Sequence, residues 1–552
     1  MEQWVLPAVL AGVTLLFVAW AVLDGRRRAR WLRRRVRDSF GAVPVDTGPG
    51  LATPRWYECA PGRGVRLDEQ TWQDLGMDEV FARVNACGSL LGEAYLYAQL
   101  HEMCGEETLQ KRRALCKMLE ASPQLCFDVR LLFAKLGRRR GADPAFVFAD
   151  QSAQLRAPTV YRVCAWLPLA ALPLALFSAA GGAAFIAACC LNVLLYQRAK
   201  PLLEGKSESL AYLMRAVDMA GALAQRLRKE GAAPQLCAAL EEAAQPLRPL
   251  VSARMKLSMP RSEEADTLTE WARMLLLIPV RAYLRAVRVL RAQRACAVRL
   301  CALLGEMDMA CATASFRASL PHWCEPECGE VLEMDGVYHP LLTRPVVNGA
   351  RFARGALFTG SNASGKSTFL KAAAVNAVLA QTVYTCAARR FALPQFAWPV
   401  VTSMAVGDDL AAGESYFVAE VLSLKRLVDL ADGGGAGLCV IDEILRGTNT
   451  AERVAASAAV LRHLAASRVL CLAATHDTEL PALVQPEFDN YHFCESVEDG
   501  RVHFDYLLQP GVCTTRNAIA LLRAMGYPPD VTQSAERGAQ HFLDTGEWAR
   551  VP

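Results

Sequence analysis

The order of apolar and polar residues divides the chain into three kinds of segment. Residues 4–23 and 163–197 are long, almost uninterrupted apolar runs. Residues 74–136 and 202–316 carry apolar residues every three or four positions, the spacing of amphipathic helices. From about Glu330, short apolar or β-branched runs alternate with helical segments, which is typical of βα units around a mainly parallel sheet. The pattern predicts a helical region with apolar insertions, followed by an α/β domain.

The first apolar run is about as long as a membrane-spanning helix. Residues 4–23 match the ~20 residues that cross the hydrocarbon core of a bilayer, and eight arginines follow between Arg26 and Arg37. A cleaved signal peptide carries its positive charges before a shorter apolar core, so we expect an uncleaved anchor with the arginines in the cytoplasm. We interpret the arginines as a topology and lipid-headgroup signal. A solvated basic helix and a nucleic-acid-binding segment are the alternatives.

A phosphate-binding loop is the clearest chemical signal. Residues 360–367, GSNASGKS, fit the pattern G-x-x-x-x-G-K-[ST] between an expected strand and an expected helix. In such a loop the backbone N–H groups bind phosphate, the lysine (Lys366) neutralises the β and γ oxygens, and the final hydroxyl (Ser367) ligates Mg²⁺. The residues expected to bind ATP are Gly360, Ser361, Asn362, Ala363, Ser364, Gly365, Lys366, Ser367 and Thr368.

The second apolar run is too long for one untilted helix. A single crossing at residues 163–197 would place the phosphate loop outside the cell, where ATP is scarce, whereas a hairpin returns the chain to the cytoplasm. Arg162 before the run and Arg198 after it agree with a hairpin. We therefore predict a two-helix membrane hairpin that turns near Gly181 and Gly182. A buried, alanine-rich helix pair in a soluble core is the alternative.

Two further strands end in polar side chains suited to ATP hydrolysis. The strand in GLCVIDEILRGTN ends at Asp442, which can hold the Mg²⁺ shell, and at Glu443, which can activate the attacking water. The strand in RVLCLAATHD ends at His476, which is placed to contact the γ-phosphate or the water. We predict Glu443 and His476 as catalytic residues, and Ser367 with Asp442 as the Mg²⁺ site.

These motifs together resemble one family. In this order, the phosphate loop, GDDLAAGESYFVAEV, IDEILRGTNTAER and ATHDTEL are similar to the ATPase domain of the MutS family of DNA mismatch-repair proteins, a branch of the ABC-type ATPases. The resemblance extends from about Tyr338 to Val531. More weakly, residues 77–97 and 303–316 resemble the beginning and end of the helical lever domain of that family.

The resemblance implies a dimeric ATP site. In that family two ATPase domains face each other, and a signature segment of one subunit completes the nucleotide site of the other. Carried over, Ser415 would meet the γ-phosphate across a homodimer with support from Glu420, and residues 446–450 would form the interface loop. Tyr416 departs from the family pattern, which usually has threonine there.

Other departures concern the task of the protein. The family's mismatch-reading domain, with its Phe-x-Glu wedge, and the connector domain have no counterpart before the lever, and the Phe-x-Glu of this chain, 493–495, follows the ATPase strands. The apolar hairpin stands where the DNA-clamping lever tip would be. The chain thus resembles a membrane-attached, MutS-related branch without the mismatch reader.

Composition adds few constraints. The net charge of +4 is small for 552 residues, and 19 scattered cysteines are typical of reduced thiols in a cytosolic protein. His322, Cys324 and Cys328 have loosely metal-like spacing, but no matching second pair is evident, so we expect a connecting loop. The arginines at 281, 285, 288, 291 and 294 share one helical face, which we interpret as solvated; acidic lipid or nucleic acid is the alternative partner.

The sequence therefore predicts an α/β P-loop ATPase of the ABC-type, MutS-like class, with a helical lever and transmembrane helices. The expected segments are an anchor (1–23), a basic linker (24–73), a first lever segment (74–160), the hairpin (161–197), a second lever segment (198–329), the ATPase domain (330–509) and a C-terminal helical dimerisation element (510–552).

The expected function is ATP hydrolysis at a homodimer interface that drives lever movement at the cytoplasmic membrane, with ATP and Mg²⁺ as cofactors. Membrane lipid and an unidentified protein are the expected partners, and a mismatch-repair-related contact with DNA is a further interpretation. A transport ATPase subunit, and a protein-partner switch that binds no DNA, are the alternatives.

Overall fold

The computed structural model describes most of the 552 residues and divides them into two compact units. The described residues are 5–45, 47–60, 62, 64–139, 141–148, 158–251, 271, 274–361, 364–404, 416–445, 448–498, 501–512, 519, 522–523 and 525–548. Unit 1 consists of Met1–Pro61, Val84–Ala98 and Lys111–Ser319. Unit 2 consists of Gly62–Arg83, Gln99–Gln110 and Leu320–Pro552.

Unit 1 is built from helices, in agreement with the predicted helical periodicity. Wholly or for most of their length, its helices are α1 (Val5–Asp38), α2 (Thr53–Cys59), α5 (Leu90–Leu100), α6 (Glu106–Ala121), α7 (Pro123–Leu136), η2 (Pro144–Val147), α8 (Pro158–Cys164), α9 (Leu167–Phe177), α10 (Ala179–Lys229), α11 (Pro234–Ala244), η4 (Gln245–Leu247), α12 (Arg248–Val251), α15 (Ile278–Ala292) and α16 (Arg294–Ser319). One apolar core joins α5, α7, α10, α11, α15 and α16, with Phe133, Leu223 and Leu304 among its fully buried members.

A buried carboxylate fixes the beginning of α5. Asp308 of α16 accepts hydrogen bonds from the backbone N–H groups of Gly88 (3.0 Å) and Ser89 (2.8 Å) and from the Ser89 hydroxyl (2.5 Å). Burial raises the pKa of Asp308 to about 6, although these hydrogen bonds favour the charged form. Gly92 lies so close that a Cβ atom there would be 2.2 Å from Asp308 Oδ2. The glycine is therefore needed for the carboxylate to reach the helix end.

The apolar run at 163–197 forms a helical hairpin. Helix α9 ends at Phe177 and α10 begins at Ala179, so the turn is at Ser178, close to the predicted position, and Gly181 and Gly182 lie in the first turn of α10. Ser178 is the N-cap of α10, because its hydroxyl accepts the Gly181 N–H at 3.0 Å. Gly181 allows close helix contact, since a Cβ atom there would lie 2.0 Å from the Leu174 carbonyl oxygen.

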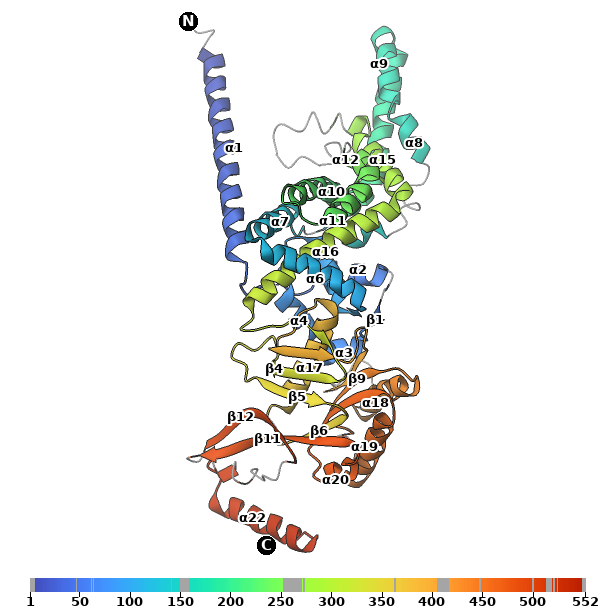
Figure 1. The fold of residues 1–552 in the computed structure, drawn as a ribbon. Helices are drawn as coiled ribbons and strands as arrows, with labels where there is room; N and C mark the ends of the chain where they lie inside the picture. Colours follow the sequence, from blue (N-terminus) through green and yellow to red (C-terminus); the bar gives the residue numbers. More distant parts are fainter. Residues whose placement is uncertain are drawn as a thin grey trace. The chain divides into compact units, whose positions relative to one another are not determined.

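Two segments of this hairpin are long and apolar enough to cross a membrane. They are Thr159–Phe177 and Ala179–Pro201, within the portion of the chain that the structure describes, and an 18-residue stretch of each is 28% and 22% buried, respectively. The expected first span, 4–23, begins outside the described residues and continues as α1, one helix through the arginine run. Helix α1 and the α9–α10 hairpin project beyond the other helices of this unit (Figure 1).

Unit 2 contains the predicted α/β domain. Its helices are α3 (Glu69–Asp74), α4 (Met77–Val84, all but its last residue), α17 (Lys366–Thr382), α18 (Tyr416–Asp432), α19 (Thr450–Ala465), α20 (Leu480–Val484) and α22 (Pro529–Thr545). Its strands are β1 (Val65–Arg66), β2 (Glu102–Met103), β3 (Glu327–Cys328), β4 (Leu332–Val337), β5 (Asn348–Phe352), β6 (Gly355–Thr359), β7 (Arg390–Leu393), β8 (Val400–Ser403), β9 (Gly437–Asp442), β10 (Val469–Ala474), β11 (Phe488–Glu498) and β12 (Arg501–Pro510).

The main sheet is mostly parallel, as predicted. Its order is β12-β11-β6-β10-β9-β8, and only the β11–β12 pair is antiparallel. The three strands expected from the sequence are β6, β9 and β10. Helices α18 and α19 pack on the sheet through a core that includes Leu427, Ile441, Leu461 and Cys471. Because all residues of β6 and β9 are buried, these strands are covered on both faces.

Residues from early in the chain complete unit 2, which differs from the predicted division. The lever was expected to begin at residue 74, yet Asp74 belongs to unit 2. Its carboxylate accepts hydrogen bonds from the Thr402 hydroxyl (2.7 Å) and the Met404 N–H (3.0 Å), and the Thr71 hydroxyl accepts the Thr402 N–H (3.1 Å). These contacts cover β8, the edge strand of the main sheet, so α3 protects polar groups that would otherwise be open to pairing.

The segment with His322, Cys324 and Cys328 belongs to unit 2 and forms more than a connecting loop. Cys324 exchanges two backbone hydrogen bonds of 3.0 Å with Cys386, and Cys328 lies in β3 of the second sheet, whose order is β3-β7-β4-β5. His322 Nε2 contacts the Gly336 carbonyl oxygen at 2.9 Å. Among the described residues, no group of three or more His, Cys, Asp or Glu side chains could hold a metal ion.

The Gly92 contact gives a stability prediction. Gly92→Ala should lower the free energy of unfolding by about 2–4 kcal/mol, because the new methyl group displaces Asp308 and leaves buried N–H groups unpaired. Gly221→Ala is the matched control, since a Cβ atom on this helical glycine would have nothing within 4 Å and the variant should gain up to about 1 kcal/mol. Thermal unfolding of the purified chain measures both. Equal melting temperatures for the two variants would contradict the packing described for Gly92.

Candidate functional site

The phosphate loop lies between β6 and α17, at the carboxyl end of a buried strand. Two of its glycines have backbone angles that favour glycine, Gly360 with φ of 140° and Gly365 with φ of 107°. A Cβ atom on Gly360 would lie 2.6 Å from the Phe493 carbonyl oxygen, so β11 packs directly behind the loop. The predicted residues Asn362 and Ala363 lie outside the described residues of the chain.

Polar groups of the loop fit a polyphosphate. Lys366 begins α17, and its Nζ donates to the carbonyl oxygens of Gly360 and Ser361, both at 2.7 Å. Ser364 Oγ is buried and has no hydrogen-bond partner among the described residues. Ser367 and Thr368 are exposed in the first turn of α17, where the helix dipole favours anions. A lysine, hydroxyls and a helix N-terminus at one place form a donor set suited to phosphate oxygens.

Strand register places the two acidic residues beside this loop. Strand β10 lies between β6 and β9, and its Ala474 pairs with Phe358 on one side and with Asp442 on the other. Asp442 is therefore level with the end of β6, just before the phosphate loop. Its side chain is buried. A carboxylate at this position could hold a Mg²⁺ shell, and the predicted Mg²⁺ role of Asp442 stays a prediction.

The predicted catalytic pair is in contact. His476 Nε2 lies 2.7 Å from Glu443 Oε1, and the two side chains remain 34% and 23% exposed, so both are accessible from the site. Each follows the end of a neighbouring parallel strand. A carboxylate held by an imidazole and open to solvent can orient a water molecule and accept its proton.

The backbone at Glu443 is in a conformation that is costly for a residue with a side chain. Its φ is 64°, and Leu445 has φ of 56°. Such conformations cost on the order of 1–3 kcal/mol each and persist only where the surroundings enforce them. Here Ile444 and Leu445 are buried in the core of α18 and α19, and the Glu443 N–H donates to the Ala474 carbonyl oxygen at 3.0 Å. The core thus fixes the direction of the Glu443 side chain.

A cavity beside the loop adds residues that the sequence analysis did not assign to the site. It has a volume of about 340 Å³ and includes Gly365 and Thr368 among its lining residues. Tyr338, His339 and Tyr506 line other sides of it. Burial, followed by the nearby Lys371 charge, lowers the pKa of His339 to about 4. A neutral imidazole and aromatic rings suit the base of a nucleotide. The sequence signal for this cavity is the segment that begins at Tyr338, which the sequence analysis used only as the start of the family resemblance.

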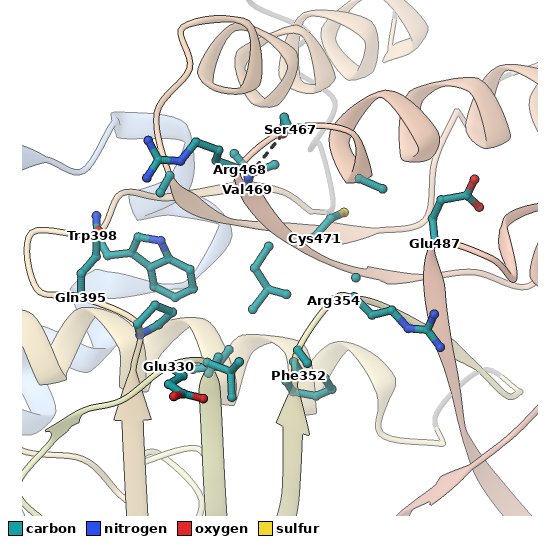
Figure 2. A pocket seen from close by; sticks show the side chains of 18 of the residues that line it. Glu330, Phe352, Arg354, Gln395, Trp398, Ser467, Arg468, Val469, Cys471 and Glu487 are labelled. Carbon is teal, nitrogen blue, oxygen red and sulfur yellow. Dashed lines mark hydrogen bonds between the residues drawn. The ribbon is translucent and has the colours of Figure 1, made fainter.

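A second cavity of about 490 Å³ lies away from this site (Figure 2). Gly355 and Val469, which begin β6 and β10, line it, so it opens at the amino ends of the strands. The phosphate loop is at the carboxyl ends. Arg354 at this cavity forms an ion pair with Asp489, in which Nε and Nη2 both donate to Oδ1, at 2.8 and 2.5 Å.

The predicted signature segment is only partly described. Ser415 lies outside the described residues, as do residues 446 and 447 of the expected interface loop. Glu420 lies in α18 and is buried. Its predicted support of a nucleotide in a second subunit stays a prediction.

Comparison with known proteins identifies the domain. Residues 356–543 match the family model of MutS domain V. The chain carries a MutS-family ATPase domain. Domain V is a P-loop ATPase, which agrees with the loop, the acidic pair and the histidine found at the carboxyl ends of β6, β9 and β10. The predicted enzyme class and this portion of the predicted fold are confirmed, and a large helical region precedes the domain.

The relatives are similar over less than half of this chain. A DNA mismatch repair protein MutS of Natronomonas pharaonis is 32% identical over 259 residues, which are 44% of this chain and 29% of the relative. The MutS of a Thermus thermophilus strain is 32% identical over 238 residues, covering 42% and 29%. DNA mismatch repair protein MutS 2 of Halobacterium salinarum is 31% identical over 241 residues, covering 41% and 27%. The chain thus spans less than a third of these curated relatives.

The buried histidine gives a prediction for pH dependence. The pKa of His339 is about 4 in the folded chain and 6.5 ordinarily, so the unfolded chain binds the extra proton between these values. The contribution of His339 to the free energy of unfolding is therefore fully present above pH 6.5 and is lost as the pH falls toward 4. Between pH 7 and pH 5 the loss is about 2 kcal/mol. Thermal unfolding at pH 7 and pH 5 should show a smaller loss for His339→Gln than for the wild type. Equal losses would contradict the buried, neutral state of His339.

Proposed function

We propose that the chain is a membrane-anchored, homodimeric MutS-type ATPase in which ATP bound between two subunits drives movement of the helical unit. The observation that carries the catalytic role is the contact between Glu443 and His476 beside the phosphate loop. The ATP-binding residues predicted from the sequence, 360–368, keep that assignment. Asp442 and Ser367 would hold Mg²⁺, which supplies positive charge to the β- and γ-phosphate oxygens when bound.

The site residues suggest one course for hydrolysis. Glu443 accepts the proton of a water molecule whose oxygen attacks the γ-phosphorus, and the bond from that phosphorus to the β,γ-bridging oxygen breaks to give ADP and phosphate. His476 holds Glu443 in place through the 2.7 Å contact. Lys366 stabilises the negative charge on the transferred group. Each role uses a side chain already directed to the carboxyl edge of the sheet.

Dimerisation is proposed from the family and from one surface of unit 2. Proteins of the MutS family typically dimerise. The helix that follows the predicted signature segment, α18, exposes Phe417, Val418, Val421 and Leu422. An apolar surface beside Ser415 suits an interface in which each subunit lends Ser415 to its neighbour's γ-phosphate, with Glu420 in support. The C-terminal element at 510–552 is proposed as a second dimer contact.

The membrane assignment rests on the surface of the hairpin. Leu176 is 78% exposed and Phe177 is 88% exposed at its tip, and Ile186 and Leu194 are each 63% exposed. A helix pair in a soluble core would bury such side chains, whereas lipid would cover them. We propose that the hairpin and α1 cross the cytoplasmic membrane and that unit 2 lies in the cytoplasm.

A contact with DNA is a second candidate, favoured by one surface. Arg285, Arg288, Arg291 and Arg294 are exposed along α15 and the beginning of α16. A row of arginines suits a phosphate backbone or acidic lipid headgroups. The relatives described above are DNA mismatch repair proteins, whereas this chain covers less than a third of their length.

Two variants test the ATPase proposal. Lys366→Ala should abolish nucleotide binding, because the phosphates lose their closest positive charge. Glu443→Gln should retain ATP but lower turnover by at least about 100-fold, because the amide cannot accept the proton of water. Hydrolysis, nucleotide binding and molecular mass are measured on the purified full chain, and Glu443→Gln with ATP should form a dimer. Unchanged hydrolysis in Glu443→Gln would remove that residue from its role.

The trapped dimer also discriminates between the partner candidates. Captured from solubilised membranes, Glu443→Gln would be scored for nucleic acid and protein together, with Lys366→Ala as the control. DNA on the trap, lost steeply with rising salt, would favour the DNA candidate. Protein without DNA would favour a membrane switch.

Thiol labelling tests the topology. Cys328 is exposed in unit 2, and Cys190 is exposed on the hairpin. A membrane-impermeant maleimide should leave Cys328 unmodified in intact cells and modify it in inverted vesicles. Cys190 should react slowly in both because lipid covers it. Modification of Cys328 from outside the cell would overturn the proposed orientation.

A further inference from the structure

A second ion pair includes the residue next to His476. Arg453 of α19 donates to both carboxylate oxygens of Asp477, with Nη2–Oδ1 at 2.6 Å, Nε–Oδ2 at 3.1 Å and Nε–Oδ1 at 3.2 Å. The Arg453 side chain is 26% exposed and the Asp477 side chain 12% exposed. A bidentate, largely buried ion pair fixes the relative orientation of the two side chains as well as their distance, whereas an exposed pair does not.

Asp477 is the residue after His476, so the pair acts on the loop that carries the histidine. The other side of this loop is held by the sheet, because the Thr475 N–H donates to the Phe358 carbonyl oxygen at 3.0 Å. The Thr475 hydroxyl in turn accepts the Asp477 N–H at 3.0 Å. His476 thus lies between one residue fixed to β6 and one fixed to α19.

The helix that supplies Arg453 begins a few residues after Glu443 in the sequence, and its N-terminus is capped. Asn449 caps α19 by accepting the Glu452 N–H at 3.0 Å, and Arg453 follows in the first turns of that helix. Two side-chain contacts, Glu443 with His476 and Arg453 with Asp477, therefore connect the segment after β9 to the segment after β10. Glu443 contacts His476, His476 is bonded to Asp477, and Asp477 pairs with Arg453.

Charge supports the same arrangement. Hydrogen bonding to Asp477 raises the pKa of Arg453 against the effect of burial, and the negative charges of Glu443 and Glu479 raise it further. One guanidinium group therefore neutralises a carboxylate next to the catalytic pair. Without it, the negative charge of Asp477 would lie beside Glu443 and the incoming triphosphate.

We propose that Arg453 and Asp477 are a positioning pair that holds His476, and through it Glu443, in the geometry needed for ATP hydrolysis. The proposal rests on the ATPase function proposed above and adds two residues to it. Neither residue contacts the phosphates directly; both act through the loop after β10. Loss of the pair should therefore slow the chemical step while leaving nucleotide affinity nearly unchanged.

The experiment measures steady-state ATP hydrolysis of the purified full chain. Arg453→Gln and Asp477→Asn should each lower kcat by about 10- to 100-fold with KM within about twofold, because small misplacement of a catalytic group costs this much. Arg453→Lys should lose less, since lysine keeps the charge but not the fork. The double variant should be no slower than the slower single variant, as expected for residues that act as one unit.

Arg354 provides a control, because its ion pair with Asp489 also uses two donors of one guanidinium group but lies at the amino end of β6, away from the phosphate loop. Arg354→Gln should leave kcat within about twofold of the wild type, since its loop carries no catalytic side chain. An equal loss in Arg354→Gln, multiplied losses in the double variant, or a raised KM with unchanged kcat would overturn the positioning role.

Failure of this inference is distinguishable from failure of the ATPase proposal. If the wild type hydrolyses ATP no faster than Lys366→Ala, the ATPase proposal fails and the pair loses its role with it. If the wild type is active, Glu443→Gln is inactive and Arg453→Gln keeps the wild-type kcat, only the positioning pair is overturned. Thermal unfolding of each variant shows whether a lost rate reflects a lost fold.

Discussion

The register of three parallel strands is the constraint on which the site depends. Residues Leu472–Ala474 of β10 pair with Ala356–Phe358 of β6 and with Val440–Asp442 of β9. A slip by one residue would turn every buried side chain of these strands to the opposite face, and both faces are covered. The register is therefore fixed by burial. It alone brings the phosphate loop, the acidic pair and His476, which are far apart in the sequence, to one edge.

Register fixes where the strands end but not where the side chains point. A left-handed backbone conformation sets the direction of the Glu443 side chain. This conformation costs on the order of 1–3 kcal/mol, and the burial of Ile444 and Leu445 offsets that cost. Hydrogen bonds and the Arg453–Asp477 pair set the direction of the His476 side chain. The side chains of Glu443 and His476, for which we propose catalytic roles, are thus oriented by different means, the first by core packing and the second by charge.

The sequence was sufficient for those features of the molecule that are encoded locally. The phosphate loop, the acidic pair and His476 follow directly from short motifs at strand ends. Asp74 could not be placed in this way, because its hydrogen-bond partner Thr402 is 328 residues away. The hairpin turn was predicted near the glycine pair, which is typical of turns, and the Ser178 cap is the local signal that fixes where the second helix begins. The apolar composition thus predicted the hairpin, whereas the serine cap determines the residue at which its second helix begins.

Helix α10 connects the hairpin to the rest of unit 1 as a single element. It runs for 51 residues from the hairpin turn into the helical core, with Pro201 as its one internal proline. Within the hairpin, the fully buried Asn192 donates through Nδ2 to the carbonyl oxygens of Cys164 (2.9 Å) and Leu275 (2.6 Å), which lie where neighbouring helices break. In lipid, carbonyl groups at helix breaks need such a donor. The helix is continuous, and Asn192 of the hairpin itself supplies the hydrogen bonds for the carbonyl groups at the helix breaks. A rotation of the core helices would therefore move the hairpin as well. An ATPase that moves these helices would therefore act on the hairpin through α10.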